Sequence, residues 1–104
     1  MTLKERINGA KATPFQKKVW RALLSIPKGE LRSYEWLAKK AGSPRSARAV
    51  GNALNKNPFA PEVPCHRVIR KDGSLGGYAK GLAAKIRLLR KEGLHMNSLS
   101  PRGA

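Results

Sequence analysis

Cysteine is the scarcest of the chemically informative residues, because Cys65 is the only one among 104 residues. The chain therefore cannot form an internal disulfide bond or a zinc site built from several cysteines. A protein without disulfide bonds is typical of a reducing, intracellular compartment. We expect the cytoplasm or nucleoid if the source is a prokaryote, and the nucleus if it is a eukaryote.

Long hydrophobic runs are also lacking. No uninterrupted apolar segment approaches the roughly 20 residues that a membrane-spanning helix needs. The first residues, Met-Thr-Leu-Lys-Glu-Arg-Ile-Asn, contain no apolar core of the kind found in secretory signals. We therefore expect no membrane partner.

Acidic residues are few, and the chain carries a large positive charge as a result. Lys and Arg number 22 and Asp and Glu number 6, which gives a net charge of +16. Self-repulsion at this charge destabilises a compact chain, and an anionic partner relieves it. A polyphosphate backbone fits best, because each neutralised phosphate releases condensed counterions. A basic surface without any partner is the less favoured alternative.

The length of the chain is that of one small domain. Its hydrophobic residues amount to 40%, which suffices for one modest core. The first dozen residues are polar and basic with no clear period, and the last residues are rich in Ser, Pro and Gly. We expect a flexible basic arm over 1–12, a folded domain over 13–94 and a disordered tail over 95–104.

A first helix is predicted after Thr13. Thr13 and Gln16 match a capping box, the usual start of a helix. Apolar residues then recur every four positions from Phe15 to Leu23, which indicates one buried face of a helix. The helix is expected to end near Pro27.

Two shorter helices follow in the sequence. Ser33 is a cap that predicts a helix over 34–41, and Gly42 ends it. The next helix is predicted over 46–56 from a stripe of apolar residues. Two short helices joined by a glycine-containing turn are typical of a helix-turn-helix. Together with the basic charge, this pattern favours DNA binding.

The second half of the domain predicts one hairpin and one helix. The segment 63–70 resembles a short strand, and 71–74, Lys-Asp-Gly-Ser, carries a hairpin turn pattern. A last helix is predicted over 82–92, with Gly93 as its terminator. We therefore expect a mainly α domain with a small β-hairpin, similar to a winged helix-turn-helix.

The segment Pro64-Cys65-His66-Arg67-Val68 is the sharpest chemical feature. A cysteine reacts as its thiolate, and nearby cations or a histidine partner promote that form. On adjacency alone, a structural cysteine beside a capping histidine remains the favoured interpretation. Consecutive residues on a strand also point to opposite faces, so Cys65 and His66 need a turn or a bridging water to communicate.

This segment closely resembles the active-site motif of the O6-alkylguanine-DNA alkyltransferases, also called methylated-DNA–protein-cysteine methyltransferases. The resemblance covers about residues 13–94. Its further matches, in order and at compatible spacing, are Ser33-Tyr34, Ala47-Arg48-Ala49-Val50-Gly51, Asn57-Pro58, Gly77-Tyr78 and Lys91-Glu92-Gly93.

The resemblance implies a single-turnover DNA-repair transferase. Cys65 would attack the O6-alkyl carbon of guanine and keep the alkyl group permanently. His66 would take the thiol proton through a water, and Glu92 would hold the distal nitrogen of His66. Tyr34 would donate to the leaving base, and Asn57 would tie the helix-turn-helix to the active-site segment. No metal, nucleotide or organic cofactor is implied.

The resemblance also implies how DNA is held. The partner is double-stranded DNA containing O6-alkylguanine, and the protein acts as a monomer. Arg48 would fill the space left by the flipped nucleotide, and small residues would let the helix enter the minor groove. The implied DNA-contacting residues are Tyr34, Ala47, Arg48, Ala49, Gly51 and Asn52, and the implied base pocket is Val68, Tyr78 and Ala79. Asn52 and Asn55 leave major-groove reading open as an alternative.

Each of these residues also has a plainer interpretation. Tyr34 suits a packing aromatic at a helix start, and Asn57 suits a turn before proline. Arg48 is one of many cations able to bind phosphate. Glu92 is an ordinary helix-end carboxylate, although the helix dipole disfavours an anion there.

Three other functions compete with transfer. An alkyltransferase-like lesion binder is similarly short, but those proteins replace the cysteine, typically with Trp, so Cys65 favours transfer. A winged-helix transcription regulator would bind an operator, usually as a dimer, and no dimerisation segment is evident. A thiol hydrolase would need an oxyanion hole, which nothing in the sequence suggests. Many members of the alkyltransferase family carry an additional N-terminal domain, and this chain looks like the C-terminal domain alone.

Overall fold

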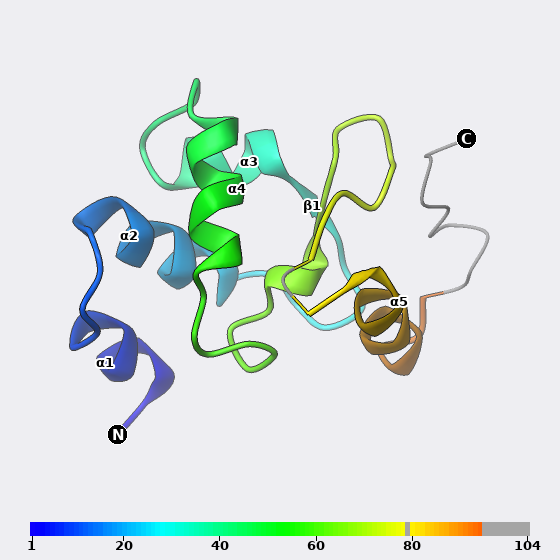
Figure 1. The fold of residues 1–104 in the computed structure, drawn as a ribbon, viewed down its shortest axis with the longest axis horizontal. Coiled ribbons are helices and arrows are strands. Elements are labelled where there is room, and N and C mark those ends of the chain that lie inside the picture. Colours follow the sequence, from blue (N-terminus) through cyan, green and yellow to red (C-terminus); the bar gives the residue numbers. More distant parts are fainter. Residues whose placement is uncertain (79, 95–104) are drawn as a thin grey trace.

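The computed structural model describes residues 1–78 and 80–94 (Figure 1). The described residues form five α-helices: α1 (Leu3–Asn8), α2 (Pro14–Leu23), α3 (Tyr34–Lys40), α4 (Ala47–Asn55) and α5 (Leu82–Lys91). A two-stranded sheet joins β1 (Arg32–Ser33) to β2 (Val68–Ile69), and a 3-10 turn covers Cys65–Arg67. Among the described residues, no helix is both long and apolar enough to cross a membrane.

The helix-turn-helix lies where the sequence predicts it. The hydroxyl of Ser33 accepts a hydrogen bond from the Trp36 backbone N–H, at 3.0 Å, and starts α3. After α3, Gly42 adopts φ +81°, a backbone conformation that favours glycine, and the chain turns into α4. The capping box of Thr13 and Gln16 at the start of α2 is also present. These predictions are confirmed.

Helices α2, α3 and α4 pack on one another around the core. Val19 and Leu23 of α2, Leu37 of α3 and Val50 of α4 are fully buried. The indole N–H of Trp20 donates to the backbone carbonyl of Ala53, at 2.9 Å, and so joins α2 to α4. Figure 1 shows α5 on the other side of the domain, where it contacts the 3-10 turn.

The arm expected over 1–12 contains the helix α1, so a flexible arm is the wrong description of residues 3–8. A capping box between Thr2 and Glu5 starts the helix, and Ile7 is fully buried. The Arg21 guanidinium of α2 donates to the Asn8 side-chain carbonyl, at 2.8 Å. The helix is too short to show a hydrophobic period, and its stability comes from packing on α2.

The expected hairpin is replaced by a parallel pairing. Arg32 pairs with Val68 and Ser33 with Ile69, so the two strands come from segments far apart in the chain. The turn after Arg70 is present and is closed by a hydrogen bond from the Arg70 N–H to the Ser74 carbonyl, at 2.9 Å. Only 68–69 of the predicted strand 63–70 is extended, because a 3-10 turn precedes it. A mainly helical domain with a small sheet and a helix-turn-helix is nevertheless confirmed.

Candidate active site

Cys65 lies at the start of the 3-10 turn and lines a pocket. The Cys65 N–H donates to the Val63 carbonyl at 2.9 Å, and the Arg67 N–H donates to the Pro64 carbonyl at 3.1 Å. These bonds fold the predicted strand into a tight turn. Cys65 is only 4% exposed, and what remains accessible faces the pocket.

The pocket above Cys65 has a volume of about 420 Å³. Its walls come from the start of α3, one face of α4 and the segment 70–78. The predicted residues that line it with Cys65 are Tyr34, Ala47, Arg48, Gly51, Asn52 and Tyr78. Four of the α4 residues predicted to contact DNA therefore line the same pocket as the thiol.

Two of the residues predicted to contact DNA or to form the base pocket do not line this pocket. Ala49 is exposed on α4 outside the pocket lining, about 100° around the helix from Arg48. Val68 is the first residue of β2, its side chain is fully buried, and its carbonyl accepts from the Lys85 ammonium at 2.8 Å. Ala79 lies outside the described residues, as does the tail expected over 95–104.

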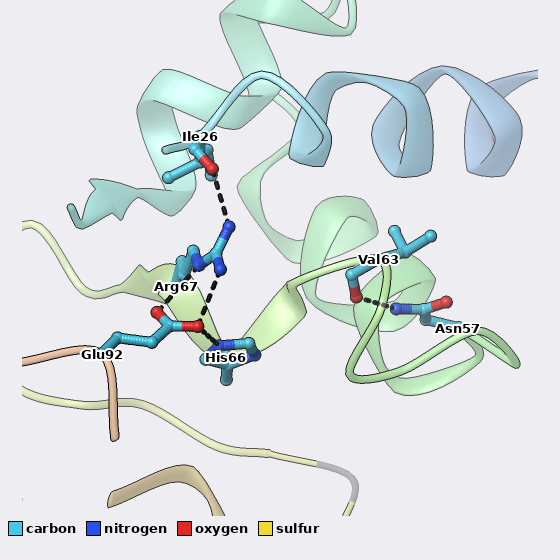
Figure 2. Close-up of polar contacts among 6 residues, drawn as sticks. All are labelled: Ile26, Asn57, Val63, His66, Arg67 and Glu92. Atoms are coloured by element: carbon cyan, nitrogen blue, oxygen red, sulfur yellow. Dashed lines mark hydrogen bonds and ion pairs between the residues drawn. The ribbon is translucent and has the colours of Figure 1, made fainter. Parts of the chain in front are cut away.

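His66 is not among the residues that line the pocket, and its ring contacts Glu92 (Figure 2). Its Nε2 lies 2.9 Å from Glu92 Oε2, and the imidazole is 1% exposed. Glu92 can only accept when ionised, so Nε2 carries the proton and donates it. Nδ1 then keeps its lone pair, and it is buried without a hydrogen-bond partner among the described residues. This nitrogen is the one able to accept a proton.

Arg67 holds Glu92 in place, a contact that the sequence analysis did not anticipate. Its Nε donates to Oε1 at 2.9 Å and its Nη2 to Oε2 at 2.7 Å, a bidentate geometry. Its Nη1 donates to the Ile26 carbonyl, at 2.8 Å, and ties the pair to the loop after α2 (Figure 2). The position of Arg67 inside the Pro-Cys-His-Arg motif was the feature of the sequence that could have indicated this role.

The site at rest holds a thiol and a neutral imidazole. Burial raises the pKa of the Cys65 thiol, although nearby Asn57 and Lys85 counteract the effect. Burial also lowers the pKa of His66 below 6.5, against the opposing hydrogen bond and charge of Glu92. The thiol therefore needs a base to react, and the imidazole is in the form that can act as one.

Glu92 makes the folded state sensitive to acid. Burial favours its neutral form, but hydrogen bonds from Arg67 and His66 outweigh burial and lower its pKa from 4.5 to about 2. The folded protein thus binds this proton less readily than the unfolded chain does. The resulting stability is present above pH 4.5 and is lost as the pH falls towards 2.

We therefore expect Glu92→Gln to cost most stability near neutral pH. The shift corresponds to a loss on the order of 3 kcal/mol on full protonation. Chemical denaturation of the wild type and the variant at pH 6 and at pH 2.5 measures the effect. The difference in unfolding free energy should shrink at the lower pH, and a constant difference contradicts this role.

Asn57 connects the end of α4 to the active-site segment. Its Nδ2 donates to the Val63 carbonyl, at 2.9 Å (Figure 2). Its Oδ1 accepts from the Phe59 N–H, at 2.9 Å. These bonds shape the loop that leads to Cys65. The bond to Phe59 is that of an asparagine in a turn before proline, and the bond to Val63 links the end of the helix-turn-helix to the active-site segment.

Lys85 is the second residue that the sequence analysis missed. It is fully buried on α5, and its ammonium donates to the carbonyls of Val68, Leu75 and Gly77, at 2.8 Å for Val68 and 3.2 Å for Gly77. Burial lowers its pKa to about 8. Lys85 therefore ties β2 to the segment that lines the pocket. Its position four residues before buried Leu89 was the available signal.

Two tyrosines complete the pocket. Burial raises the pKa of Tyr34, and burial with neighbouring Cys65 raises that of Tyr78 to about 12, so both hydroxyls stay protonated donors. Gly76 makes room for Tyr34: a Cβ there would lie 2.6 Å from the Tyr34 hydroxyl, and its φ is +69°. The Tyr78 ring meets His66 edge-on, with centroids 6.4 Å apart.

Comparisons with known proteins identify the family of this chain. Residues 14–94 match the family described as 6-O-methylguanine DNA methyltransferase, DNA binding domain. A methylated-DNA–protein-cysteine methyltransferase of Methanosarcina acetivorans is 57% identical over 81 residues, which are 78% of this chain and 52% of that protein. The crystal structure of Mycobacterium tuberculosis OGT in complex with DNA superposes with a TM-score of 0.77 at 47% identity, over 89% of this chain and 54% of that one.

A shorter protein is also similar. S. pombe Atl1, in complex with damaged DNA containing O6-carboxymethylguanine, superposes with a TM-score of 0.72 at 30% identity. The match covers 83% of this chain and 82% of Atl1. The chain thus spans about half the length of the methyltransferases it matches and most of Atl1.

Proposed function

Because this chain belongs to the family of 6-O-methylguanine DNA methyltransferase DNA-binding domains, we propose that it repairs DNA by irreversible alkyl transfer. The alkyl group moves from O6-alkylguanine to Cys65, and each protein molecule acts once. The observation that carries the proposal is the sole thiol in the lining of a pocket, backed by a histidine whose free nitrogen is buried. No cofactor enters the reaction.

The transfer is a displacement at carbon. The sulfur of Cys65 forms a bond to the alkyl carbon as the bond from that carbon to O6 of guanine breaks. The thiol proton passes to Nδ1 of His66 through a water, and Glu92 stabilises the imidazolium that forms. Tyr34 donates to the departing guanine, so the base does not leave as a bare anion.

DNA binding and nucleotide flipping bring the lesion to Cys65. The target carbon is inaccessible inside a duplex, so the nucleotide must leave the stack. The small residues of α4 allow a close approach in the minor groove, and Asn57 holds the helix-turn-helix against the active-site loop. A monomer suffices, acting in the cytoplasm or nucleoid of a prokaryote or the nucleus of a eukaryote.

Arg48→Ala is expected to slow repair of duplex DNA, because Arg48 stabilises the flipped state. The loss should shrink when the lesion faces a weakly pairing base, since less unpairing energy then opposes flipping. Single-turnover rates with both duplexes measure it. Arg48→Lys keeps the charge but lacks the planar guanidinium, so we expect it to restore affinity and only part of the rate.

Exposed Arg90 on α5 provides a matched control for Arg48. Arg90→Ala removes the same charge outside the pocket and should leave the dependence on the opposing base unchanged. Full rescue by Arg48→Lys, with no such dependence, would leave Arg48 as a phosphate contact only.

A lesion binder without transfer activity is the second candidate function. The match to Atl1 over 82% of its length favours it. Intact-protein mass spectrometry after incubation with an O6-methylguanine duplex separates the two candidates. Transfer adds one methyl group in place of the thiol proton, and an unmethylated duplex of the same sequence adds nothing. Stable binding without a mass increase would establish the lesion binder instead.

A further inference from the structure

A second concavity lies where α1, α2 and α3 meet, apart from the pocket of Cys65. Its volume is about 510 Å³. Four cationic side chains line it: Lys4 of α1, Lys18 and Arg21 of α2, and Lys40 at the end of α3. The three lysines are exposed to solvent. We call this surface the junction surface.

The charge of the junction surface is not neutralised within the described residues. Five of the six Asp and Glu side chains bond to residues outside this surface: Glu5, Glu30, Glu62, Asp72 and Glu92. The sixth, Glu35, lines the Cys65 pocket. Arg21 donates only to the neutral side chain of Asn8. Lys40 lies over the ring of Trp36, 5.6 Å from its centroid, which leaves its charge in place. Such a cluster attracts an anion.

The junction surface continues the surface that faces the Cys65 pocket. Gly42, in the turn between α3 and α4, lines the concavity, and exposed Arg45 follows in the same turn. The next cationic residue along the chain is Arg48, which lines the Cys65 pocket. Positively charged side chains therefore continue along the chain from the junction surface, through the turn of the helix-turn-helix, to the Cys65 pocket.

Helix α3 sets the separation of the two hollows. Tyr34 at its first residue lines the Cys65 pocket, and Lys40 at its last residue lines the junction surface. The six helical steps from Tyr34 to Lys40 rise about 9 Å, which corresponds to between two and three nucleotides at roughly 3.4 Å of helix axis each. A DNA backbone that passes the Cys65 pocket can thus reach the junction surface within a few nucleotides.

We propose that the junction surface binds the phosphate backbone of the duplex on one side of the lesion. The inference rests on the proposed repair function and extends it, because it makes the DNA contact asymmetric. Cations spread over three helices and open to solvent suit a row of phosphates rather than a single enclosed anion. The helix α1 gains a role, because it supplies Lys4 and is held on α2 by buried Ile7.

The test compares two variants that remove equal charge. The junction variant combines Lys4→Gln, Lys18→Gln and Lys40→Gln. The control variant combines Arg87→Gln, Arg90→Gln and Lys91→Gln, all exposed on α5. Binding is measured by fluorescence anisotropy over a range of salt concentrations, with Cys65→Ala present in every protein so that no transfer occurs. The duplexes carry the lesion near one end or near the other.

We expect that extending the duplex on one particular side of the lesion tightens binding by the parent protein, whereas an equal extension on the other side does not. The junction variant should lose that gain, and its salt slope should fall in magnitude by roughly 0.9 for each phosphate contact removed. The control variant should keep the gain. Equal losses in both variants, or unchanged binding by the junction variant, overturn the proposal, and a loss that is equal on both sides overturns the one-sided placement.

A separate readout keeps the two proposals distinguishable. With Cys65 restored, the junction variant should transfer the methyl group at the parent's rate once the DNA is saturating. Asymmetric binding without any transfer would refute the repair function and leave the junction surface standing. Normal transfer with equally tight binding on both sides of the lesion would support the repair function and refute the junction surface.

Discussion

Cys65→Ala is expected to abolish alkyl transfer while leaving the affinity for duplex DNA nearly unchanged. Cys65 is the only thiol of the chain, so no other side chain can replace it as the nucleophile. It is 4% exposed and lies beneath the residues of α4 that face the pocket. Phosphate contacts supply most of the affinity of such complexes, and the thiol makes none of them.

Two measurements check this expectation. Intact-protein mass spectrometry reports transfer, and anisotropy with the same lesion-containing duplex reports binding. Cys65→Ser is the matched control, because it keeps the shape of the side chain but its hydroxyl is a far weaker nucleophile. Any methyl transfer by the alanine variant would refute the assignment of Cys65.

The second large effect is expected at the pair of His66 and Glu92. His66→Gln and Glu92→Gln should each slow transfer by about 10²–10⁴-fold, the usual worth of general-base assistance. Binding should change far less, because both side chains lie behind the pocket and not in its lining. Single-turnover rates at saturating DNA separate the reaction step from binding.

Arg67 offers the control that Glu92 needs. Glu92→Gln removes support for His66 and also weakens the contact with Arg67. Arg67→Gln removes the latter contact, together with the bond from Arg67 to the Ile26 carbonyl, and keeps the carboxylate beside His66. We expect Glu92→Gln to be much the slower of the two variants. Equal rates would mean that Glu92 only holds the helix end in place.

The pH profile gives an independent test of the same pair. His66 accepts a proton only when neutral, and its pKa lies below 6.5. The wild-type rate should therefore fall only as the pH drops below that value. The charge and hydrogen bond of Glu92 raise the pKa of His66. Removing them in Glu92→Gln should move the fall in rate to lower pH, and an unmoved profile would contradict the relay.

Local contacts made much of the fold and site predictable. The caps at Thr13 and Ser33 bond backbone groups three residues away, so a short segment contains all the information. Gly42 ends α3 through its own backbone conformation. Through its resemblance to the alkyltransferases, the motif around Cys65 likewise predicts a nucleophile and a base without any knowledge of the fold.

Contacts between distant segments were decided by the tertiary structure alone. The parallel pairing of 32–33 with 68–69 replaced the expected hairpin, and packing on α2 made a helix of the expected arm. Arg67 and Lys85 were missed because their partners lie 25 residues away or on another element. The charge of the chain predicted an anionic partner, but only folding brought Lys4, Lys18 and Lys40 to one surface. Sequence patterns extend over a few residues, whereas the direction of a side chain towards a remote partner depends on how the helices pack.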